Sequence, residues 1–364
     1  MKSIQVTRTS LPPYDEYCEE IRKFWDSRMV SNIGEEHKAF EKELQKYLGS
    51  RQLRLFANGH LALEAAIRAM GLPPGSEVIT VPYTFPSTVH AIVRCSLKPV
   101  FCDVLESDCT MDPAKVENLI SEKTSAIIPV HVYGNPCDVY ALGAIADRHG
   151  LKLIYDAAHA FGVSYEGTPL VNFGDASMMS FHATKVFSTI EGGAVFFSGE
   201  TLSSALEDER NFGIRDYESC VYAGGNAKMN EFQAAMGMCN LWHINHDLAR
   251  RRQIRARYER NLAGVKGLRI ASPRSGTAIN GAYVPVILER DRDRIAEKLA
   301  GDGIFCRKYF YPPVNRMECY EGRFPAGATH VSDYLSSRVL SMPIYPDLEA
   351  EDVDIICRRL LLYL

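Results

Sequence analysis

Short apolar runs alternate with stretches of helical spacing through the first half of the chain. The apolar runs, each long enough for one strand, are Leu53–Phe56, Val78–Val81, Val100–Asp103, Ala126–Val130 and Leu151–Asp156. The helical patterns cover residues 36–48, 61–70, 86–95, 113–121 and 137–149. This alternation predicts a mostly parallel sheet covered by helices. The runs SAIIPV and LKLIYD are apolar on both faces, as is typical of strands buried on both sides.

The pattern changes in the second half of the chain. Two further strands are expected at Ala176–Phe181 and Ala194–Ser198, a long helix from about Met229 to Leu262, and a connector rich in Gly and Pro at 263–280. After the connector we expect a strand at Ala282–Glu289, a helix at Asp291–Ala300, a short strand at Ile304–Cys306 and a helix at Ala350–Leu364. The prediction is therefore an α/β fold with three layers around a mostly parallel central sheet. An N-terminal arm and a large domain occupy residues 1–245, and a long connecting helix and a small α+β domain occupy residues 246–364.

Composition and charge exclude several classes of protein. The 364 residues include 41 Lys and Arg against 45 Asp and Glu, a net charge of −4, and 46% are hydrophobic. This balance is typical of a globular protein and unlike that of a disordered chain or of a protein that coats nucleic acid. No apolar stretch approaches the length of a membrane helix. The ten cysteines form no C-x-x-C pair, and the first residues lack the apolar core of a signal peptide, so we expect free thiols, no metal site and a cytoplasmic location.

Candidate chemistry follows the expected strands, because ligands of open α/β sheets bind at the carboxyl ends of the strands. Gly59 and His60 open a helix after the first strand, where backbone N–H groups can bind phosphate, although such a turn alone is more often a simple helix cap. Phe85, in VPYTFP, could stack on a planar cofactor, or it could belong to the core.

Two charged residues follow later strands. Asp156 ends a strand that is expected to be buried, which is costly unless a cation accompanies the carboxylate. Lys185 lies between two apolar strands, and a lysine removed from water there has a lowered pKa and can form a Schiff base. A structural ion pair and a solvated surface lysine are the plainer interpretations of these two residues.

Together these residues match the needs of pyridoxal 5′-phosphate (PLP): a phosphate cradle (Gly59, Ser180), a stacking aromatic ring, a carboxylate for the pyridinium nitrogen and a lysine for the aldehyde. The segments that contain them resemble the DegT/StrS sugar aminotransferases, which have the aspartate aminotransferase fold (PLP fold type I). The resemblance lies in FANGHLALEAAI, VPYTFPSTVHAI, PVHVYGNPCDV, YDAAHAFG, SFHATKVFSTIEGGA and GGNAKMNEFQAA, and in the C-terminal KYFYPP and LSMPIYP.

The resemblance implies roles for individual residues. Lys185 corresponds to the Schiff-base lysine, Asp156 to the partner of the ring nitrogen and His159 to a residue near the pyridoxal oxygen. The stacking aromatic is Phe85, and the phosphate cradle consists of Gly59, His60 and Ser180. Asn226 corresponds to an asparagine that reaches the phosphate from a neighbouring subunit, which implies a homodimer with shared active sites.

Two positions depart from the family pattern. His60 stands where a small Thr or Ser is usual, so a hydroxyl contact to the phosphate is lost while the backbone N–H remains. Lys228 stands in place of a common Arg, and an ammonium group does not make the bidentate contact of a guanidinium.

The implied activity is transfer of an amino group from L-glutamate to a nucleotide-linked keto-deoxysugar in deoxysugar biosynthesis, for instance that of lipopolysaccharide O-antigens. The segments are most similar to those of enzymes that act on dTDP-4-keto-6-deoxyglucose. A 3-keto sugar or a UDP-linked 4-keto HexNAc is an alternative substrate. A PLP-dependent sugar dehydratase is disfavoured, because that branch replaces the lysine by His, and a non-catalytic regulatory relative is disfavoured by the intact Lys185, Asp156 and Ser180.

Overall fold

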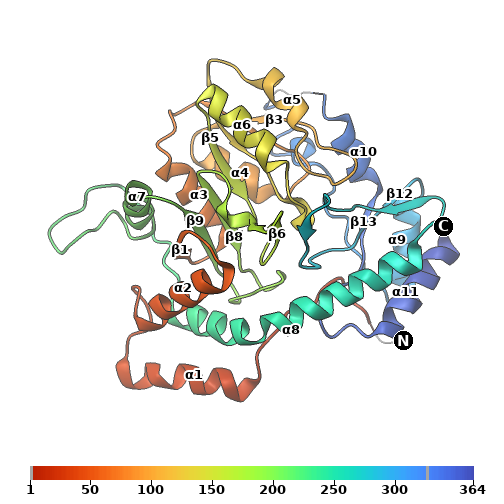
Figure 1. Ribbon diagram of the computed structural model, residues 1–364, viewed down its shortest axis with the longest axis horizontal. Helices are drawn as coiled ribbons and strands as arrows, with labels where there is room; N and C mark the ends of the chain where they lie inside the picture. Colours follow the sequence, from red (N-terminus) through yellow and green to blue (C-terminus); the bar gives the residue numbers. More distant parts are fainter. Residues whose placement is uncertain (1–2, 325–327) are drawn as a thin grey trace.

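The computed structural model describes residues 3–324 and 328–364. Within these residues, seven strands form a central sheet in the order β1-β9-β8-β5-β4-β2-β3 (Figure 1). The strands are β1 (Gln52–Phe56), β2 (Glu77–Thr80), β3 (Lys98–Phe101), β4 (Thr124–Ile128), β5 (Lys152–Asp156), β8 (Ala176–Ser180) and β9 (Gly193–Phe197). β9 runs antiparallel to both of its neighbours, and the other pairs are parallel. The predicted α/β fold with a mostly parallel sheet is confirmed.

Helices cover both faces of this sheet, because the side chains of each strand alternate between two apolar layers. In β5, Leu153 and Tyr155 enter one layer and Ile154 the other. The layer around Ile154 is completed by α3 (Gly59–Ala69), α4 (Pro86–Arg94) and α7 (Glu200–Arg210). The opposite face is covered by α2 (Glu35–Leu48), α6 (Val139–His149) and the first part of α8 (Glu231–Leu262). The short elements beside them are α5 (Pro113–Val116), η1 (Glu117–Leu119), η2 (Val132–Gly134), η3 (Leu170–Asn172), β6 (Ser164–Tyr165) and β7 (Thr168–Pro169).

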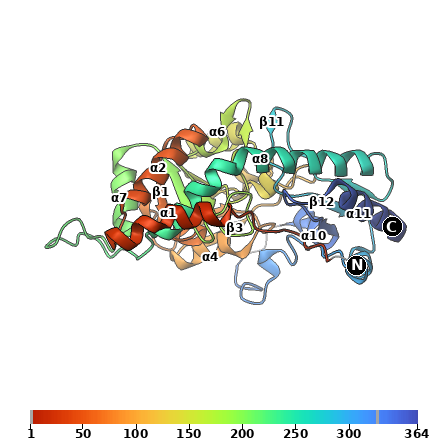
Figure 2. The ribbon, with the colours of Figure 1, turned by 90° about the horizontal axis from the view of Figure 1, so that it is seen from below.

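A second, smaller apolar core lies at the carboxyl half of α8. Its antiparallel sheet consists of β10 (Leu268–Ile270), β12 (Pro285–Leu288) and β13 (Val339–Ser341) in the described part of the chain. Around it lie α9 (Arg292–Gly301), η4 (Val314–Arg316), α10 (His330–Arg338) and α11 (Ala350–Tyr363), while β11 (Thr277–Ala278) pairs with β6. α8 extends along both cores (Figures 1 and 2), so the predicted boundary between 245 and 246 lies inside this helix. The two-domain division stays a prediction.

Several local expectations differ from the structure. The expected strand at Ile304–Cys306 is replaced by isolated bridges, because Ile304 pairs with Ile4 of the N-terminal segment and Arg307 pairs with Ser341. The stretch 113–121 divides into α5 and the 3₁₀ turn η1. Helix α1 (Tyr14–Ser27) was not predicted, and it buries only Phe24 among its 14 residues. Among the described helices, none has both the length and the apolar character that a membrane crossing requires.

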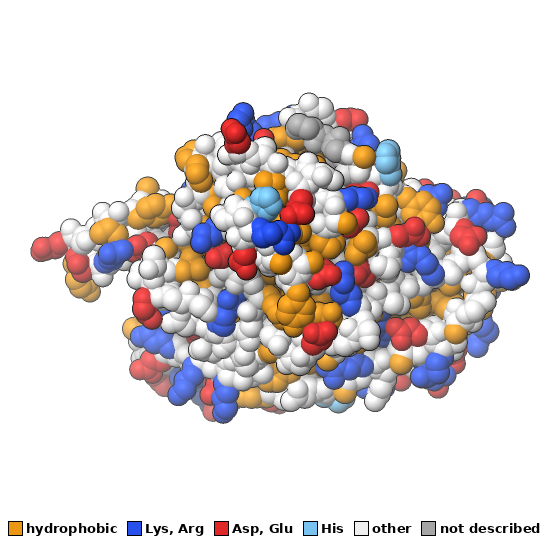
Figure 3. All heavy atoms as spheres, turned by 45° about the horizontal axis from the view of Figure 1, so that its top comes forward, with side chains coloured by type: hydrophobic (Ala, Val, Ile, Leu, Met, Phe, Trp, Pro, Cys, Tyr) orange, Lys and Arg blue, Asp and Glu red, His pale blue; other side chains and the backbone are white. Residues whose placement is uncertain are grey.

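A projecting arm, residues 211–226, leaves the body between α7 and α8 (Figures 1 and 2). Its two sides are joined by isolated bridges between Asn211 and Asn226 and between Ile214 and Cys220. The arm also stands away from the body in the space-filling view (Figure 3). Its large exposed hydrophobic side chains are Phe212, Ile214, Tyr217, Val221 and Tyr222. An arm with so much exposed apolar surface is typical of a segment that contacts another chain.

Candidate active site

Asp156 is the last residue of β5 and lies at the carboxyl edge of the sheet, where it is buried. The Thr88 hydroxyl donates to its Oδ2 at 2.7 Å, and the Ala158 N–H donates to its Oδ1 at 3.0 Å. Burial raises the pKa of Asp156, while these two hydrogen bonds and the charge of Lys185 oppose the rise. The carboxylate is therefore oriented by the protein and needs a cation for its remaining charge.

Lys185 lies in the turn between β8 and β9, where its backbone N–H donates to His182 O at 2.8 Å. Part of the side chain reaches the surface, but the amino group is surrounded by protein. This burial lowers the pKa of Lys185 to about 8, although the charge of Asp156 acts in the opposite direction. About a tenth of such amines are neutral at pH 7, far more than for a lysine of ordinary pKa, and the neutral form is the nucleophile.

His159 completes this group and lines the same narrow cleft as Lys185 and Ser180. The Tyr133 N–H donates to its Nδ1 at 3.2 Å, and the ring packs between Phe310 (stacked, centroids 5.8 Å apart) and Tyr283 (edge-on, 4.9 Å). Burial and the nearby Lys185 hold the pKa of His159 well below its usual range. The ring is therefore neutral, and because Nδ1 accepts a hydrogen bond, its proton lies on Nε2.

The start of α3 approaches β8 and β9 closely enough to require glycine. A Cβ on Gly59 would lie 2.7 Å from the Ser180 Cβ, and a Cβ on Gly193 would lie 2.7 Å from Gly59 Cα. The Asn58 side chain and carbonyl accept from the N–H groups of Leu61 and Ala62. The N–H groups of Gly59 and His60 have no acceptor in the described structure, so the helix start offers two free donors beside the Ser180 hydroxyl, as anion sites at helix starts do.

Two other predicted residues lie at the edge of this region. The His60 ring points toward α4 and α3 rather than toward the cradle, since Nδ1 lies 2.8 Å from Ser87 Oγ and Nε2 lies 3.0 Å from Glu64 Oε1. Phe85, at the start of α4, is 56% exposed, and within the described residues its ring stacks on no other aromatic ring. One face of Phe85 is thus available for a planar ligand.

Asn226 lies at the base of the projecting arm and is exposed. Its Oδ1 accepts from Lys228 Nζ at 3.2 Å, and Lys228 also donates to Asn211 at 2.8 Å. The neighbouring Ala227 O accepts from the Ala57 N–H at 2.7 Å, which ties the arm to the turn before Gly59. The structure does not place the Asn226 amide against Gly59 or Ser180 of the same chain, so its role as a phosphate ligand stays a prediction.

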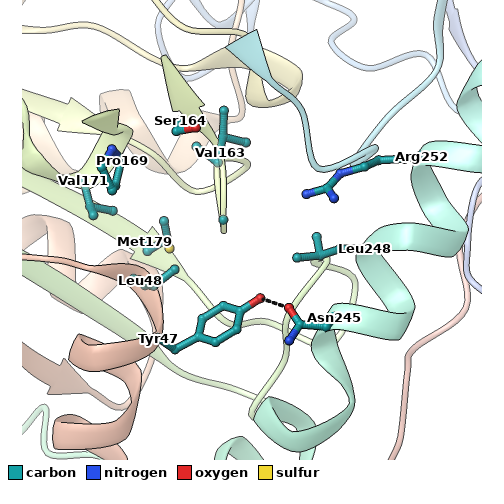
Figure 4. Close-up of a pocket in the computed structure, with 12 residues that line it drawn as sticks. Tyr47, Leu48, Val163, Ser164, Pro169, Val171, Met179, Asn245, Leu248 and Arg252 are labelled. Atoms are coloured by element: carbon teal, nitrogen blue, oxygen red, sulfur yellow. Dashed lines mark hydrogen bonds between the residues drawn. The ribbon is translucent and has the colours of Figure 1, made fainter. Parts of the chain in front are cut away.

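A different hollow of about 290 Å³ lies between the end of α2, the loop after His159 and the middle of α8 (Figure 4). Tyr47 donates to Asn245 Oδ1 at its rim, and Arg252 points into it. Its lining, as far as the structure describes the chain, includes none of the predicted site residues. The candidate active site is therefore the cleft of Lys185 and not this hollow.

Known proteins share both the sequence pattern and the fold of this chain. Residues 14–361 match the model of the DegT/DnrJ/EryC1/StrS aminotransferase family. The chain belongs to this aminotransferase family. It is 37% identical to a dTDP-4-amino-4,6-dideoxy-D-glucose transaminase of Shigella dysenteriae, over 98% of this chain and 97% of the relative. It is 36% identical to an Escherichia coli transaminase of the same name, over 99% and 98%. A crystal structure of DesI, determined in the presence of its TDP-sugar product, superposes with a TM-score of 0.94 at 32% identity, covering 100% of this chain and 93% of DesI.

The residues of this aminotransferase fit the PLP of its family. The site provides a buried carboxylate, a lysine of lowered pKa and an anion cradle in which a Cβ on Gly59 would collide with Ser180. PLP, when bound, supplies the electron sink of the reaction. Lys185 would hold the aldehyde carbon, Asp156 the ring nitrogen and the Gly59 turn with Ser180 the phosphate.

Several residues of the site were missed by sequence reasoning. Thr88 orients Asp156, the Tyr133 N–H fixes the tautomer of His159, and Phe310 and Tyr283 enclose the His159 ring. Thr88 lies two residues after the segment VPYTFP, but a threonine inside a helix has no pattern that indicates its partner. Phe310 and Tyr283 come from the C-terminal part of the chain, and only the fold brings them to the aminotransferase cleft.

The lowered pKa of Lys185 predicts how the apoprotein captures PLP. The neutral amine is the reactive form, so the capture rate should rise with pH up to about 8 and then level off. Below that value the rate should fall about tenfold per pH unit, as the neutral fraction does. Stopped-flow absorbance between about pH 7 and 10 measures this, with Nα-acetyl-lysine as the control whose rate keeps rising. A protein rate that also keeps rising toward pH 10 would show that the Lys185 amine is solvated.

Proposed function

We propose that the protein is a PLP-dependent aminotransferase that moves the amino group of L-glutamate to C4 of dTDP-4-keto-6-deoxyglucose, giving dTDP-4-amino-4,6-dideoxyglucose. The observation that carries the proposal is the placement of Lys185 and His159 in one cleft with Ser180, with the buried Asp156 carboxylate near enough to interact with the Lys185 charge and a free anion cradle beside them. The choice of sugar is supported by the names of two transaminases at 36 and 37% identity over almost the whole chain.

Each side chain has a defined task in this proposal. Asp156, oriented by Thr88, stabilises a positive charge on the ring nitrogen of the cofactor. His159 is neutral and carries its proton on Nε2, so it donates toward the ring oxygen of the cofactor. Lys185 would hold the aldehyde of the cofactor, and its free amine, with a pKa lowered to about 8, would serve as the base that moves a proton at the amino carbon. Phe85 offers its exposed ring face to the cofactor ring.

The sugar specificity is tested by a comparison of four substrates. The purified holoenzyme is given L-glutamate and, in turn, dTDP-4-keto-6-deoxyglucose, dTDP-3-keto-6-deoxyglucose, UDP-4-keto-6-deoxy-GlcNAc and GDP-4-keto-6-deoxymannose. We expect the highest kcat/KM for the dTDP-4-keto sugar. A higher value for the 3-keto sugar or for the UDP sugar would transfer the proposal to the corresponding alternative.

The homodimer with shared active sites is part of this proposal. It is supported by the projecting arm, which exposes large hydrophobic side chains and carries Asn226 at its base. The cytoplasm remains the predicted compartment and O-antigen assembly the predicted use of the product.

Subunit mixing tests the shared site. Lys185→Ala is combined with Asn226→Asp, in which a carboxylate opposes the cofactor phosphate. In a hybrid dimer with shared sites, one site has both lesions and the other has a native lysine and a native asparagine. Random exchange should therefore restore about a quarter of the wild-type activity per site, since half of the dimers are hybrids and half of their sites are intact.

The mixing experiment has two informative controls. Lys185→Ala mixed with itself should remain inactive, and native mass spectrometry should confirm subunit exchange. No recovery after confirmed exchange would mean that each site is built within one chain. An Asn226→Asp protein with full activity would mean that Asn226 does not meet the phosphate.

A further inference from the structure

A hollow of about 400 Å³ lies between the start of α4 and the segment that links α9 to η4. Thr84, Phe85 and Pro86 form one wall, and residues 306–312 with Met317 form the other. This volume falls in the range of small-molecule sites. Phe85 joins the hollow to the proposed cofactor site, and Phe310, which also lines it, stacks on His159.

Arg307 is the residue of this hollow whose charge is unused. It is exposed, and in the described part of the chain its guanidinium has neither an ion pair nor a hydrogen bond. Its backbone, by contrast, is fixed, because the Arg307 N–H donates to Ser341 O at 3.2 Å and the Ser341 N–H donates to Arg307 O at 2.7 Å. The side chain thus starts from a sheet-bonded position and keeps its five donors free.

The cations around Arg307 are already paired. Lys308 forms a close ion pair with Asp293, which also accepts from Arg292 at 2.7 Å. Arg316 pairs with Asp333 at 3.1 Å. Arg307 can therefore bind an anionic ligand without first breaking an ion pair, whereas Lys308 cannot.

We infer that the hollow takes the diphosphate of the nucleotide sugar and that Arg307 is its binding residue. This inference rests on the proposed function, since it names the part of the protein that holds the nucleotide end of that substrate. A guanidinium binds phosphate oxygens in pairs through its planar fork. A diphosphate beyond Phe85 leaves the sugar directed toward the cofactor, so binding at Arg307 also helps to position the keto carbon.

Binding of nucleoside diphosphates to the PLP-loaded protein tests the inference. Calorimetry with dTDP, UDP and GDP is performed on the wild type, on Arg307→Gln and on Arg307→Lys, and thymidine serves as the phosphate-free probe. For the diphosphate that the wild type binds best, Arg307→Gln should raise Kd by about ten- to hundredfold, the value of a charge-assisted hydrogen-bonded contact. Arg307→Lys should recover part of this loss, and thymidine should bind equally weakly to all forms.

Arg316→Gln is the matched control, because it removes the same charge from the turn η4, which follows that segment, and Arg316 does not line the hollow. It should change Kd less than threefold. This result would show that the effect of Arg307→Gln comes from direct contact with the diphosphate and not from the lower positive charge of the protein surface. A Kd for Arg307→Gln within twofold of the wild-type value would overturn the inference, and so would a wild type that binds none of the three diphosphates.

Kinetics separate this inference from the proposed function. Arg307→Gln should raise the KM for the nucleotide sugar about as much as Kd, while the rate at which L-glutamate bleaches the visible absorbance stays unchanged. If the wild type binds dTDP through Arg307 but aminates no keto-sugar, the proposed function fails and the diphosphate site stands. If the wild type aminates the sugar and Arg307→Gln keeps its KM, the diphosphate site fails and the proposed function stands.

Discussion

Replacing Lys185 by alanine is expected to abolish amino transfer and to leave the chain without covalently held PLP. The residue supplies both the amine that binds the aldehyde and the base that moves the proton, and its pKa of about 8 suits both tasks. The proton transfer alone is worth about 10²- to 10⁴-fold, so kcat should fall by about 10³-fold or more. The rate is measured with L-glutamate and the dTDP-4-keto sugar, and the attached cofactor by mass spectrometry after borohydride reduction.

Lys152→Ala is the matched control for this variant. Lys152 is an exposed lysine of β5 that pairs with Asp175 at 3.4 Å, far along the strand from Asp156. It should keep both the turnover and the reduced pyridoxyl mass. If Lys185→Ala kept that mass and turned over normally, another lysine would be the carrier.

The second large effect is expected for Asp156→Asn. The amide has nearly the same shape, but it provides no negative charge to keep the ring nitrogen of the cofactor protonated. We expect a loss of about 100-fold or more in kcat, equivalent to about 3 kcal/mol in the barrier. PLP should still bind covalently, because Lys185 and the cradle of Gly59 and Ser180 are unchanged.

A companion variant separates charge from position at Asp156. Thr88→Val removes the hydroxyl that donates to Oδ2 at 2.7 Å and keeps the carboxylate. The kcat of Thr88→Val should fall less than that of Asp156→Asn, and the visible spectrum of the bound cofactor should shift less. A near-normal rate for Asp156→Asn would mean that the carboxylate only caps the turn at Ala158.

The central sheet was predictable because its strands are buried on both faces and are therefore apolar at successive positions. β5 and β8 end at Asp156 and Ser180, within one residue of the ends expected from the sequence. The helices that were missed have weak patterns. α1 buries only Phe24, and α7 contains four acidic residues in ETLSSALEDER.

The candidate site was predictable only where a residue follows a strand. Asp156 and Ser180 end the adjacent strands β5 and β8, and Gly59 follows β1, which is separated from β8 only by the antiparallel β9, so the three residues lie at the same edge of the sheet. Thr88, Tyr283 and Phe310 do not directly follow a strand of the central sheet, so the sequence pattern does not mark them as site residues. The sequence placed His60 at the start of a helix, as the structure does. Only the structure shows that its ring contacts Ser87 and Glu64 instead of the phosphate cradle.

The most direct test of the proposed reaction is to follow isotopically labelled nitrogen from L-glutamate. The purified holoenzyme is incubated with the labelled donor and dTDP-4-keto-6-deoxyglucose, and the product is examined by NMR and mass spectrometry. We predict that the label appears on C4 of the sugar, that 2-oxoglutarate forms in equal amount and that Lys185→Ala gives neither product. Label at C3 would contradict the proposal. So would a sugar that stays unlabelled although L-glutamate bleaches the visible absorbance of the holoenzyme at the normal rate.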